Sequence, residues 1–202
     1  DETFIRLALM SQKLGKKVFI VVERLGELEI IDRVAKEINI QPNIGLRIKL
    51  ISAGQGRWAE SGGEYSKFGL NSMELIDALD FAEKRGIKNC IRLIHFHLGS
   101  QITNIRRIKN SLKEVGRFYV EFRKSGCPID YIDVGGGLGV DYDGSRSTYA
   151  SSTNYTVQEY ANDVVYHVLE SCQEADLPHP NIISESGRAM TAYHSILVFN
   201  VL

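Results

Sequence analysis

Hydrophobic residues along the chain occur in two alternating patterns. Short continuous runs rich in β-branched residues predict strands buried on both faces, near residues 18–22, 45–50, 91–96, 130–134 and 181–184. Between these runs, apolar positions recur every three or four residues, which predicts amphipathic helices. Two of the helices begin at capping boxes, in which Asn71 pairs with Glu74 and Thr156 pairs with Glu159.

The alternation of strands and helices implies a parallel sheet with right-handed crossovers, either a doubly wound sheet or part of a (β/α)8 barrel. Polar residues within the strands favour the barrel. Arg47 and Lys49 share one face of the second strand, and His95 and His97 share one face of the third. A sheet covered by helices on both sides does not accommodate such polar faces, whereas a barrel with an anionic ligand at its mouth does.

Length and composition limit the fold and the kinds of partner. A complete barrel takes about 250 residues, so this chain is expected to be one partial (β/α)8 TIM-barrel domain of the α/β class, residues 1–202. The net charge of −1 gives no electrostatic case for binding nucleic acid or an anionic membrane, and no apolar stretch is long enough to span a bilayer. Cys90, Cys127 and Cys172 lack metal-binding spacing and predict packing residues in a reducing compartment, the cytoplasm.

A run of glycines follows the fourth predicted strand. Gly135, Gly136 and Gly137 stand in the segment IDVGGGLGVDYDG, residues 132–144. Consecutive glycines let backbone N–H groups converge on an anion without obstruction from side chains. The run is not a dinucleotide fingerprint, because a polar loop of about 18 residues separates it from the next helix. A plain tight turn remains an equal alternative.

Two further strand ends carry residues suited to a phosphorylated cofactor. The fifth strand ends in Glu185, followed by Gly187 and Arg188, and an arginine fork can bind phosphate while a carboxylate holds a proton on a ring nitrogen. The third strand ends in His97, which could stack on a flat ring, and Ser100, which could donate to phosphate. The structural alternatives are a Glu–Arg ion pair that closes the fifth strand and a core histidine with satisfied hydrogen bonds.

These three segments together supply what pyridoxal 5′-phosphate (PLP) requires. They resemble, motif by motif, the PLP-dependent basic amino acid decarboxylases with an alanine-racemase-like barrel. Ornithine and diaminopimelate decarboxylases commonly have proline where Ser186 stands. Within the family the chain is most similar to the biosynthetic arginine decarboxylase branch, through four longer segments at residues 62–70, 95–102, 145–163 and 177–198.

The resemblance implies a role for each residue and an activity. His97 would stack on the PLP ring and Glu185 would pair with its nitrogen, as the two catalytic groups, and Arg47 matches an inward arginine of the family's fifth barrel strand. Phosphate binding is expected from Ser100, Gly136, Gly137 and Arg188, and Gly187 is expected to belong to the cofactor-binding set. The implied reaction converts L-arginine to agmatine and CO2 in polyamine and spermidine biosynthesis, in a cytoplasmic homo-oligomer. Mg²⁺ is a further cofactor on the resemblance alone.

The resemblance also implies that the chain is part of a larger enzyme. Its five strands would be barrel strands four to eight, with the Schiff-base lysine upstream of Asp1 and a β-rich domain after Leu202. Lys49 and Lys67 are expected to be structural rather than substitutes for that lysine. Asp141 and Asp143 could meet a guanidinium, but solvated loop acids are the favoured interpretation. The chain alone is expected not to decarboxylate arginine, although its full-length parent does.

Other interpretations stay open at this point. The chain could be a non-enzymatic PLP carrier, or a catalytically dead homologue that regulates a decarboxylase. The substrate could instead be another basic amino acid, such as ornithine, lysine or diaminopimelate.

Overall fold

The computed structural model describes residues 1–51 and 66–200. Along the chain its elements are α1 (Glu2–Lys13), β1 (Ile20–Val22), α2 (Leu25–Glu37), β2 (Ile44–Arg47), α3 (Ser72–Arg85), η3 (Lys88–Cys90), β3 (Ile91–His95), α4 (Ile105–Lys124), β4 (Tyr131–Asp133), α5 (Val157–Ala175), β5 (Asn181–Ile183) and α6 (Gly187–Thr191). The five predicted strands are therefore confirmed, although each is shorter than its hydrophobic run. The short helix α6 was not predicted.

The five strands form one parallel sheet in the order β1-β2-β3-β4-β5, as the sequence predicted. The sheet is strongly curled. Phe19, just before β1, and Tyr131 in β4 have ring centroids 4.8 Å apart, and the Lys17 ammonium donates to the Tyr131 hydroxyl. Neighbouring strands are about 4.8 Å apart, so a flat sheet would hold these two strands too far apart for such contacts. The curl is that of a partial barrel, which confirms the predicted fold class.

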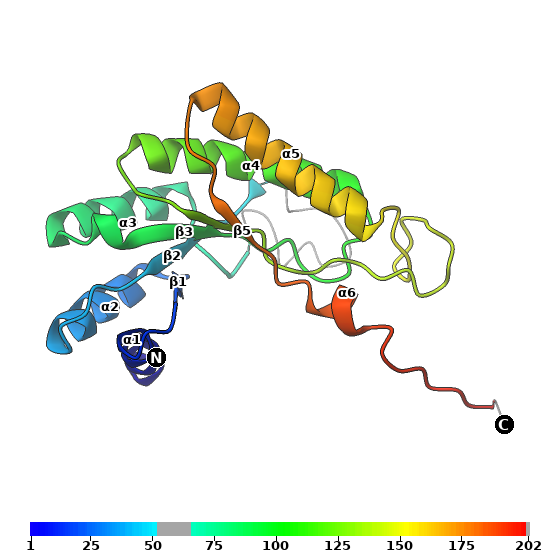
Figure 1. Cartoon of the computed structure of the whole chain (residues 1–202), viewed down its shortest axis with the longest axis horizontal. Helices are drawn as coiled ribbons and strands as arrows, with labels where there is room; N and C mark the ends of the chain where they lie inside the picture. The colour runs from blue at the N-terminus through cyan, green and yellow to red at the C-terminus, as the bar shows by residue number, and fades with distance from the viewer. Residues whose placement is uncertain (52–65, 201–202) are drawn as a thin grey trace.

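Helices cover the outer face of the sheet. In Figure 1, α1 to α5 follow one another in an arc around one side of the strands. Phe96 and Val134 point to this side and meet Leu112 of α4 and Val164 of α5 in the core. Side chains alternate between the two faces of a strand, so His95, which precedes Phe96, points to the inner face. Arg47 is the register partner of His95 and lies on the same face, as the sequence indicated.

The helix ends follow the local sequence signals. Asn71 accepts a hydrogen bond from the Glu74 N–H at 2.9 Å, while the Glu74 carboxylate accepts from the Asn71 N–H at 2.8 Å. Thr156 and Glu159 make the same reciprocal pair at the start of α5. Both predicted capping boxes are confirmed. They fix the points at which α3 and α5 leave the loops at the C-terminal ends of the strands.

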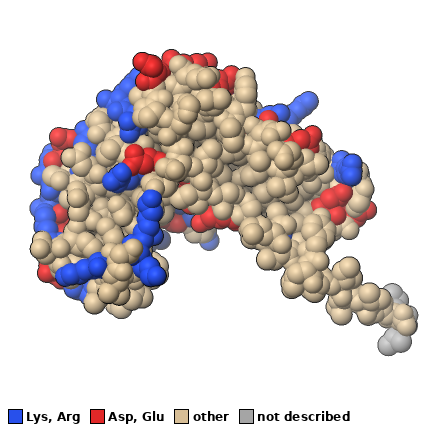
Figure 2. All heavy atoms as spheres, in the orientation of Figure 1, with Lys and Arg blue, Asp and Glu red and all other residues tan. Residues whose placement is uncertain are grey.

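Both signs of charge are interspersed over the visible face of the molecule (Figure 2). The segment from Ala189 to Asn200, at the lower right of that view, carries no Lys, Arg, Asp or Glu. Over the described residues, no helix is both long and apolar enough to cross a membrane.

Asp32 of α2 is fully buried and joins α2 to α3. Its carboxylate lies 2.7 Å from both the Lys36 ammonium and the Arg85 guanidinium, and both cations are about half exposed. Burial opposes ionisation of this carboxyl, but the hydrogen bonds from Lys36 and Arg85 outweigh burial and hold its pKa below the usual value. Folding therefore gains stability from Asp32 above its ordinary pKa and loses that stability as the pH falls through the lowered one.

The Asp32→Asn substitution is expected to lower the free energy of unfolding by about 1–3 kcal/mol at neutral pH, because it leaves two cations without their buried partner. The loss should shrink as the pH falls below the ordinary carboxyl pKa of about 4 and through the lowered pKa of Asp32, where the wild-type carboxyl is itself protonated. Urea unfolding of both proteins as a function of pH measures the difference. Asp77→Asn, at an exposed position of α3, is the control, and equal losses for the two variants would contradict the role of Asp32.

Candidate active site

A row of polar side chains crosses the inner face of the sheet near the C-terminal ends of the strands. The pairing registers place Arg47 beside His95 and His95 beside Asp133. The Arg47 guanidinium also lies 2.5 Å from the Glu23 carboxylate, which follows β1. Four consecutive strands thus present an acid, a base, an imidazole and an acid in one layer, and we call these four residues the inner polar row.

Glu185 lies just above the inner polar row, two residues beyond β5. Its carboxylate Oε2 is 3.7 Å from His95 Nε2, and its side chain is 55% exposed. Glu185, His95 and Asp133 offer ligand-type atoms that all lie within 4.8 Å of one another. The pKa of Asp133 is raised to about 6, chiefly by burial and in smaller part by the negative charge of Glu185, although the hydrogen bond from the Gly135 N–H opposes the shift. The Glu185 carboxylate therefore lies above a row in which Glu23 and Arg47 form an ion pair and His95 lies between Arg47 and Asp133.

His97 is held in a defined orientation beside the glycine run. The Gly99 N–H donates to His97 Nδ1 at 3.0 Å, so the proton of the neutral ring lies on Nε2. Burial is the largest cause of the lowered pKa of His97, followed by the positive charge of Arg47. A Cβ on Gly135 would lie 3.2 Å from the His97 ring. The half-buried imidazole is thus an uncharged flat surface next to residues 135–137, which we call the glycine loop.

The glycine loop packs directly against the other two predicted segments. A Cβ on Gly136 would lie 2.3 Å from the Glu185 carbonyl oxygen, and a Cβ on Gly137 would lie 1.8 Å from the Gly99 carbonyl oxygen. The Glu185 N–H donates to the Gly135 carbonyl at 2.8 Å. The glycines thus allow three strand ends to meet, a structural role that is compatible with the predicted anion site.

Arg188 and Ser100 meet on the same side of this loop. One guanidinium N–H of Arg188 donates to the Ser100 hydroxyl at 3.0 Å, and another donates to the Tyr142 hydroxyl at 3.2 Å. Arg188 lies in α6, which begins at Gly187, and its side chain is exposed. Among the described residues, the alternative ion pair between Glu185 and Arg188 does not form. The guanidinium and two hydroxyls make a cluster of hydrogen-bond donors suited to an anion.

The two loop acids have structural roles. Asp141 accepts from the Ser152 hydroxyl at 2.6 Å, and Asp143 accepts from the Ser151 hydroxyl at 2.5 Å. The hydrogen bond from Ser151, with a second from the Ser145 N–H, lowers the pKa of Asp143 to about 2. Both carboxylates therefore accept hydrogen bonds within the loop of residues 141–156, which we call the serine-rich loop. They stabilise this loop, and neither is bound to a guanidinium among the described residues. Of the two lysines, Lys67 is exposed above the Phe68 ring, and Lys49 is half-buried.

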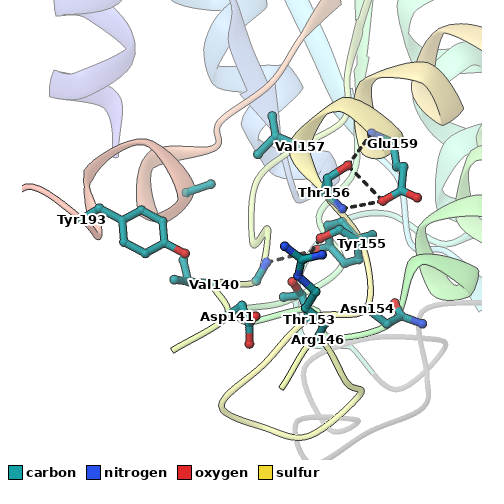
Figure 3. Close-up of a pocket in the computed structure, with 12 residues that line it drawn as sticks. Val140, Asp141, Arg146, Thr153, Asn154, Tyr155, Thr156, Val157, Glu159 and Tyr193 are labelled. Atoms are coloured by element: carbon teal, nitrogen blue, oxygen red, sulfur yellow. Dashed lines mark hydrogen bonds between the residues drawn. The ribbon is translucent and has the colours of Figure 1, made fainter. Parts of the chain in front are cut away.

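A cavity of about 470 Å³ adjoins Gly139 and Val140, just after the glycine run (Figure 3). Tyr193, which follows α6, faces Arg146 and Tyr155 of the serine-rich loop across it. The Tyr155 hydroxyl accepts from the Gly139 N–H at 3.0 Å and donates to the Ile102 carbonyl at 2.7 Å. None of the residues predicted for cofactor binding lines this cavity. Through these two hydrogen bonds, Tyr155 ties the backbone just after the glycine run to the loop that carries Ser100.

Tyr155→Phe is expected to reduce the free energy of unfolding by about 1–3 kcal/mol, because two backbone groups lose their hydrogen-bond partner. Chemical denaturation measures this loss. Tyr149→Phe is the control, since Tyr149 is exposed. If Tyr155→Phe were as stable as Tyr149→Phe, its hydroxyl would not tie the two loops together.

The arrangement fits PLP and does not fit Mg²⁺. Arg188, Ser100 and the glycine-loop backbone suit the phosphate, His97 suits the ring face and Glu185 suits the ring nitrogen. Magnesium prefers about six oxygen ligands in octahedral geometry, whereas the His95, Asp133 and Glu185 group includes a ring nitrogen. No role is therefore derived for a metal ion.

Sequence reasoning missed three residues of this region. Asp133 could have been found, because it comes just before the glycine run and alternates with the outward-facing Val134, as His95 does with Phe96. The alternation of side chains along the strand predicts the inner-face position of His95, but it predicts no function for this residue. No sequence pattern points to Tyr142, because its hydroxyl reaches Arg188 only through the conformation of the loop that contains it.

Comparison with known proteins agrees with this geometry. Residues 1–192 match the family model described as "Pyridoxal-dependent decarboxylase, pyridoxal binding domain". The whole chain is 56% identical to a biosynthetic arginine decarboxylase of Bacteroides thetaiotaomicron and 55% identical to one of Rhodopirellula baltica. It covers 32% and 30% of these two proteins, so it spans about a third of the relatives' length.

Solved structures show the same relationship. The biosynthetic arginine decarboxylase of Campylobacter jejuni matches with a TM-score of 0.80 and 38% identity, over 93% of this chain and 30% of that one. A diaminopimelate decarboxylase of Helicobacter pylori complexed with L-lysine matches with a TM-score of 0.72 and 25% identity, over 92% of this chain and 43% of that one. The chain belongs to the family of pyridoxal-dependent decarboxylases, within their pyridoxal-binding domain.

Proposed function

We propose that the protein to which this chain belongs decarboxylates L-arginine to agmatine and CO2, and that residues 1–202 form a PLP-binding unit of it. The observation that carries the proposal is the meeting of Arg188 with Ser100, 3.0 Å apart, beside a glycine loop that also contacts Glu185. Arginine is favoured over diaminopimelate because relatives of the arginine branch share 51–56% identity with the chain, against 25% for a diaminopimelate enzyme.

Each residue would contribute one task. The Arg188 fork and the Ser100 hydroxyl bind the cofactor phosphate, while the Gly136 and Gly137 backbone approaches it closely. The His97 imidazole covers one face of the ring and excludes water from it. Glu185 holds a proton on the ring nitrogen, which keeps the ring electron-poor. Bound PLP supplies the electron sink into which the electrons of the broken carboxylate bond pass.

Arg47 has a supporting task in this proposal. It is 2.5 Å from Glu23 and lies beside His95, so it would help to hold the floor of the site in place rather than bind the phosphate itself. Gly187 would contribute through its backbone, which starts α6 and so places Arg188.

The cellular setting is also part of the proposal. Cys90, Cys127 and Cys172 are free and buried, which supports a reducing compartment such as the cytoplasm. We further propose a homo-oligomer that binds neither nucleic acid nor membranes. The alternatives of a PLP carrier and a regulatory homologue both predict PLP binding without turnover.

The test is to supply the full protein and PLP with arginine, ornithine, lysine or diaminopimelate, and to measure CO2 and the amine product. Arginine should be the preferred substrate, and agmatine should be the product. Glu185→Ala should retain PLP but lose turnover by about a hundredfold or more, because the ring nitrogen loses its acid partner. PLP binding without any CO2 release would support a carrier or a regulator, and preference for another amino acid would overturn the substrate.

A further inference from the structure

His95 is the buried member of the inner polar row that lies closest to Glu185. Its exposed fraction is 6%, and it sits between Arg47 of β2 and Asp133 of β4 in the pairing register. Unlike His97, it has no ring nitrogen occupied by a backbone N–H: within the described part of the chain, its Nδ1 has no hydrogen-bond partner. A buried imidazole with so few contacts is costly unless it serves a neighbour.

The neighbour that remains available is Glu185. His95 Nε2 lies 3.7 Å from Glu185 Oε2, and a small side-chain rotation would bring the two atoms to about 2.9 Å, the usual hydrogen-bond length. Asp133 is the other side chain close to Glu185, and its Oδ1 accepts from the Gly135 N–H at 2.9 Å. When it is ionised, Asp133 has no proton to donate to the Glu185 carboxylate, whereas a neutral imidazole has one.

Glu185 needs such a contact. Its side chain is 55% exposed just beyond β5, and a free glutamate has several rotatable bonds whose ordering has an entropic cost. A carboxylate that must meet one atom of a ring is more effective when it is held in place beforehand.

We propose that His95 is a positioning residue for Glu185, which donates its Nε2–H to the Glu185 carboxylate and aims that carboxylate at the ring nitrogen of PLP. The inference rests on the proposed function, since it assumes that Glu185 meets the cofactor. His95 does not touch the cofactor itself.

The charge state of His95 agrees with this geometry. Burial, followed by the positive charge of Arg47 and by the charge that His97 carries when it is protonated, lowers the pKa of His95 to about 4. The ring is therefore neutral near neutral pH and has one N–H to donate. A charged imidazolium would instead compete with the protonated ring for Glu185.

The test uses the PLP-loaded protein with a ¹⁵N label in the cofactor ring, whose chemical shift reports whether the nitrogen is protonated. His95→Leu removes the donor at similar volume, and His95→Gln restores an N–H at similar reach. His167→Leu is the matched control, because His167 is equally buried and its Nδ1 lies 3.5 Å from Glu170, on α5.

The expected result is a protonated ring nitrogen in the wild type, in His95→Gln and in His167→Leu, and loss of that signal in His95→Leu. PLP affinity should change by less than about threefold, because the phosphate contacts are untouched. If His95→Leu does not fold, His95→Asn, whose amide is too short to reach Glu185, replaces it in the comparison with His95→Gln.

Two results would overturn the inference and are distinguishable. A protonated ring nitrogen in His95→Leu, or its loss in His95→Gln as well, would remove the donor role of His95 and leave the proposed function intact. Failure of the wild-type protein to bind PLP would overturn the proposed function together with this inference.

Discussion

Replacing Gly137 with alanine is expected to lower the free energy of unfolding by about 3–5 kcal/mol. Gly137 has a φ of +82°, in the left-handed region, and an added Cβ would lie 1.8 Å from the Gly99 carbonyl oxygen. Two effects therefore add: the backbone conformation is unfavourable for alanine, and the two loops must separate. The separation moves Ser100 away from Arg188, so PLP binding should be lost as well.

Gly144→Ala is the matched control for this prediction. Gly144 has a similar φ of +73°, but no atom lies within 4 Å of an added Cβ. Its substitution should cost only the backbone effect, about 1–2 kcal/mol. Urea unfolding of both variants separates the two contributions. Equal losses would show that close packing of the glycine loop against Gly99 is unimportant for stability.

Arg188→Ala is expected to weaken PLP binding by about a hundredfold or more, because a two-pronged charge-assisted contact with phosphate is worth about 3–5 kcal/mol. Arg188→Lys keeps the charge but not the planar guanidinium, so its PLP affinity should lie between those of the wild type and Arg188→Ala. Titration with PLP, followed by fluorescence or calorimetry, measures the change. Pyridoxal, which lacks the phosphate, should bind the wild type and Arg188→Ala equally weakly.

Arg146→Ala is the control for Arg188. Arg146 lines the neighbouring cavity with Tyr193 and has no part in the contact between Arg188 and Ser100, so its loss should leave PLP affinity unchanged. A larger effect at Arg146 than at Arg188 would place the phosphate in that cavity and contradict the site as described.

Much of the fold could be predicted because the relevant signals are local. Buried parallel strands read as continuous apolar runs, and the capping boxes at Asn71 and Thr156 mark the helix starts. Strand parity placed Arg47 and His95 on the inner face, where the register now pairs them. Proximity of the three candidate segments followed from a general property of parallel sheets: their C-terminal strand ends meet at one edge.

The remaining features depend on contacts that no local pattern encodes. Helix α6 has only five residues, too few for a periodic signal, yet it decides where Arg188 points. Asp141 and Asp143 became loop supports because Ser151 and Ser152 fold back onto them. The contact of His95 with Glu185 joins residues ninety positions apart in the sequence, through a sheet curvature that only the assembled strands define.

A crystal structure of the protein soaked with PLP tests the proposed site most directly. We expect the phosphate within about 3 Å of the Arg188 guanidinium and the Ser100 hydroxyl, the His97 ring against the face of the cofactor, and the ring nitrogen at the Glu185 carboxylate. Phosphate bound elsewhere, for example in the cavity between Arg146 and Tyr193, with Glu185 away from the ring nitrogen, would contradict it.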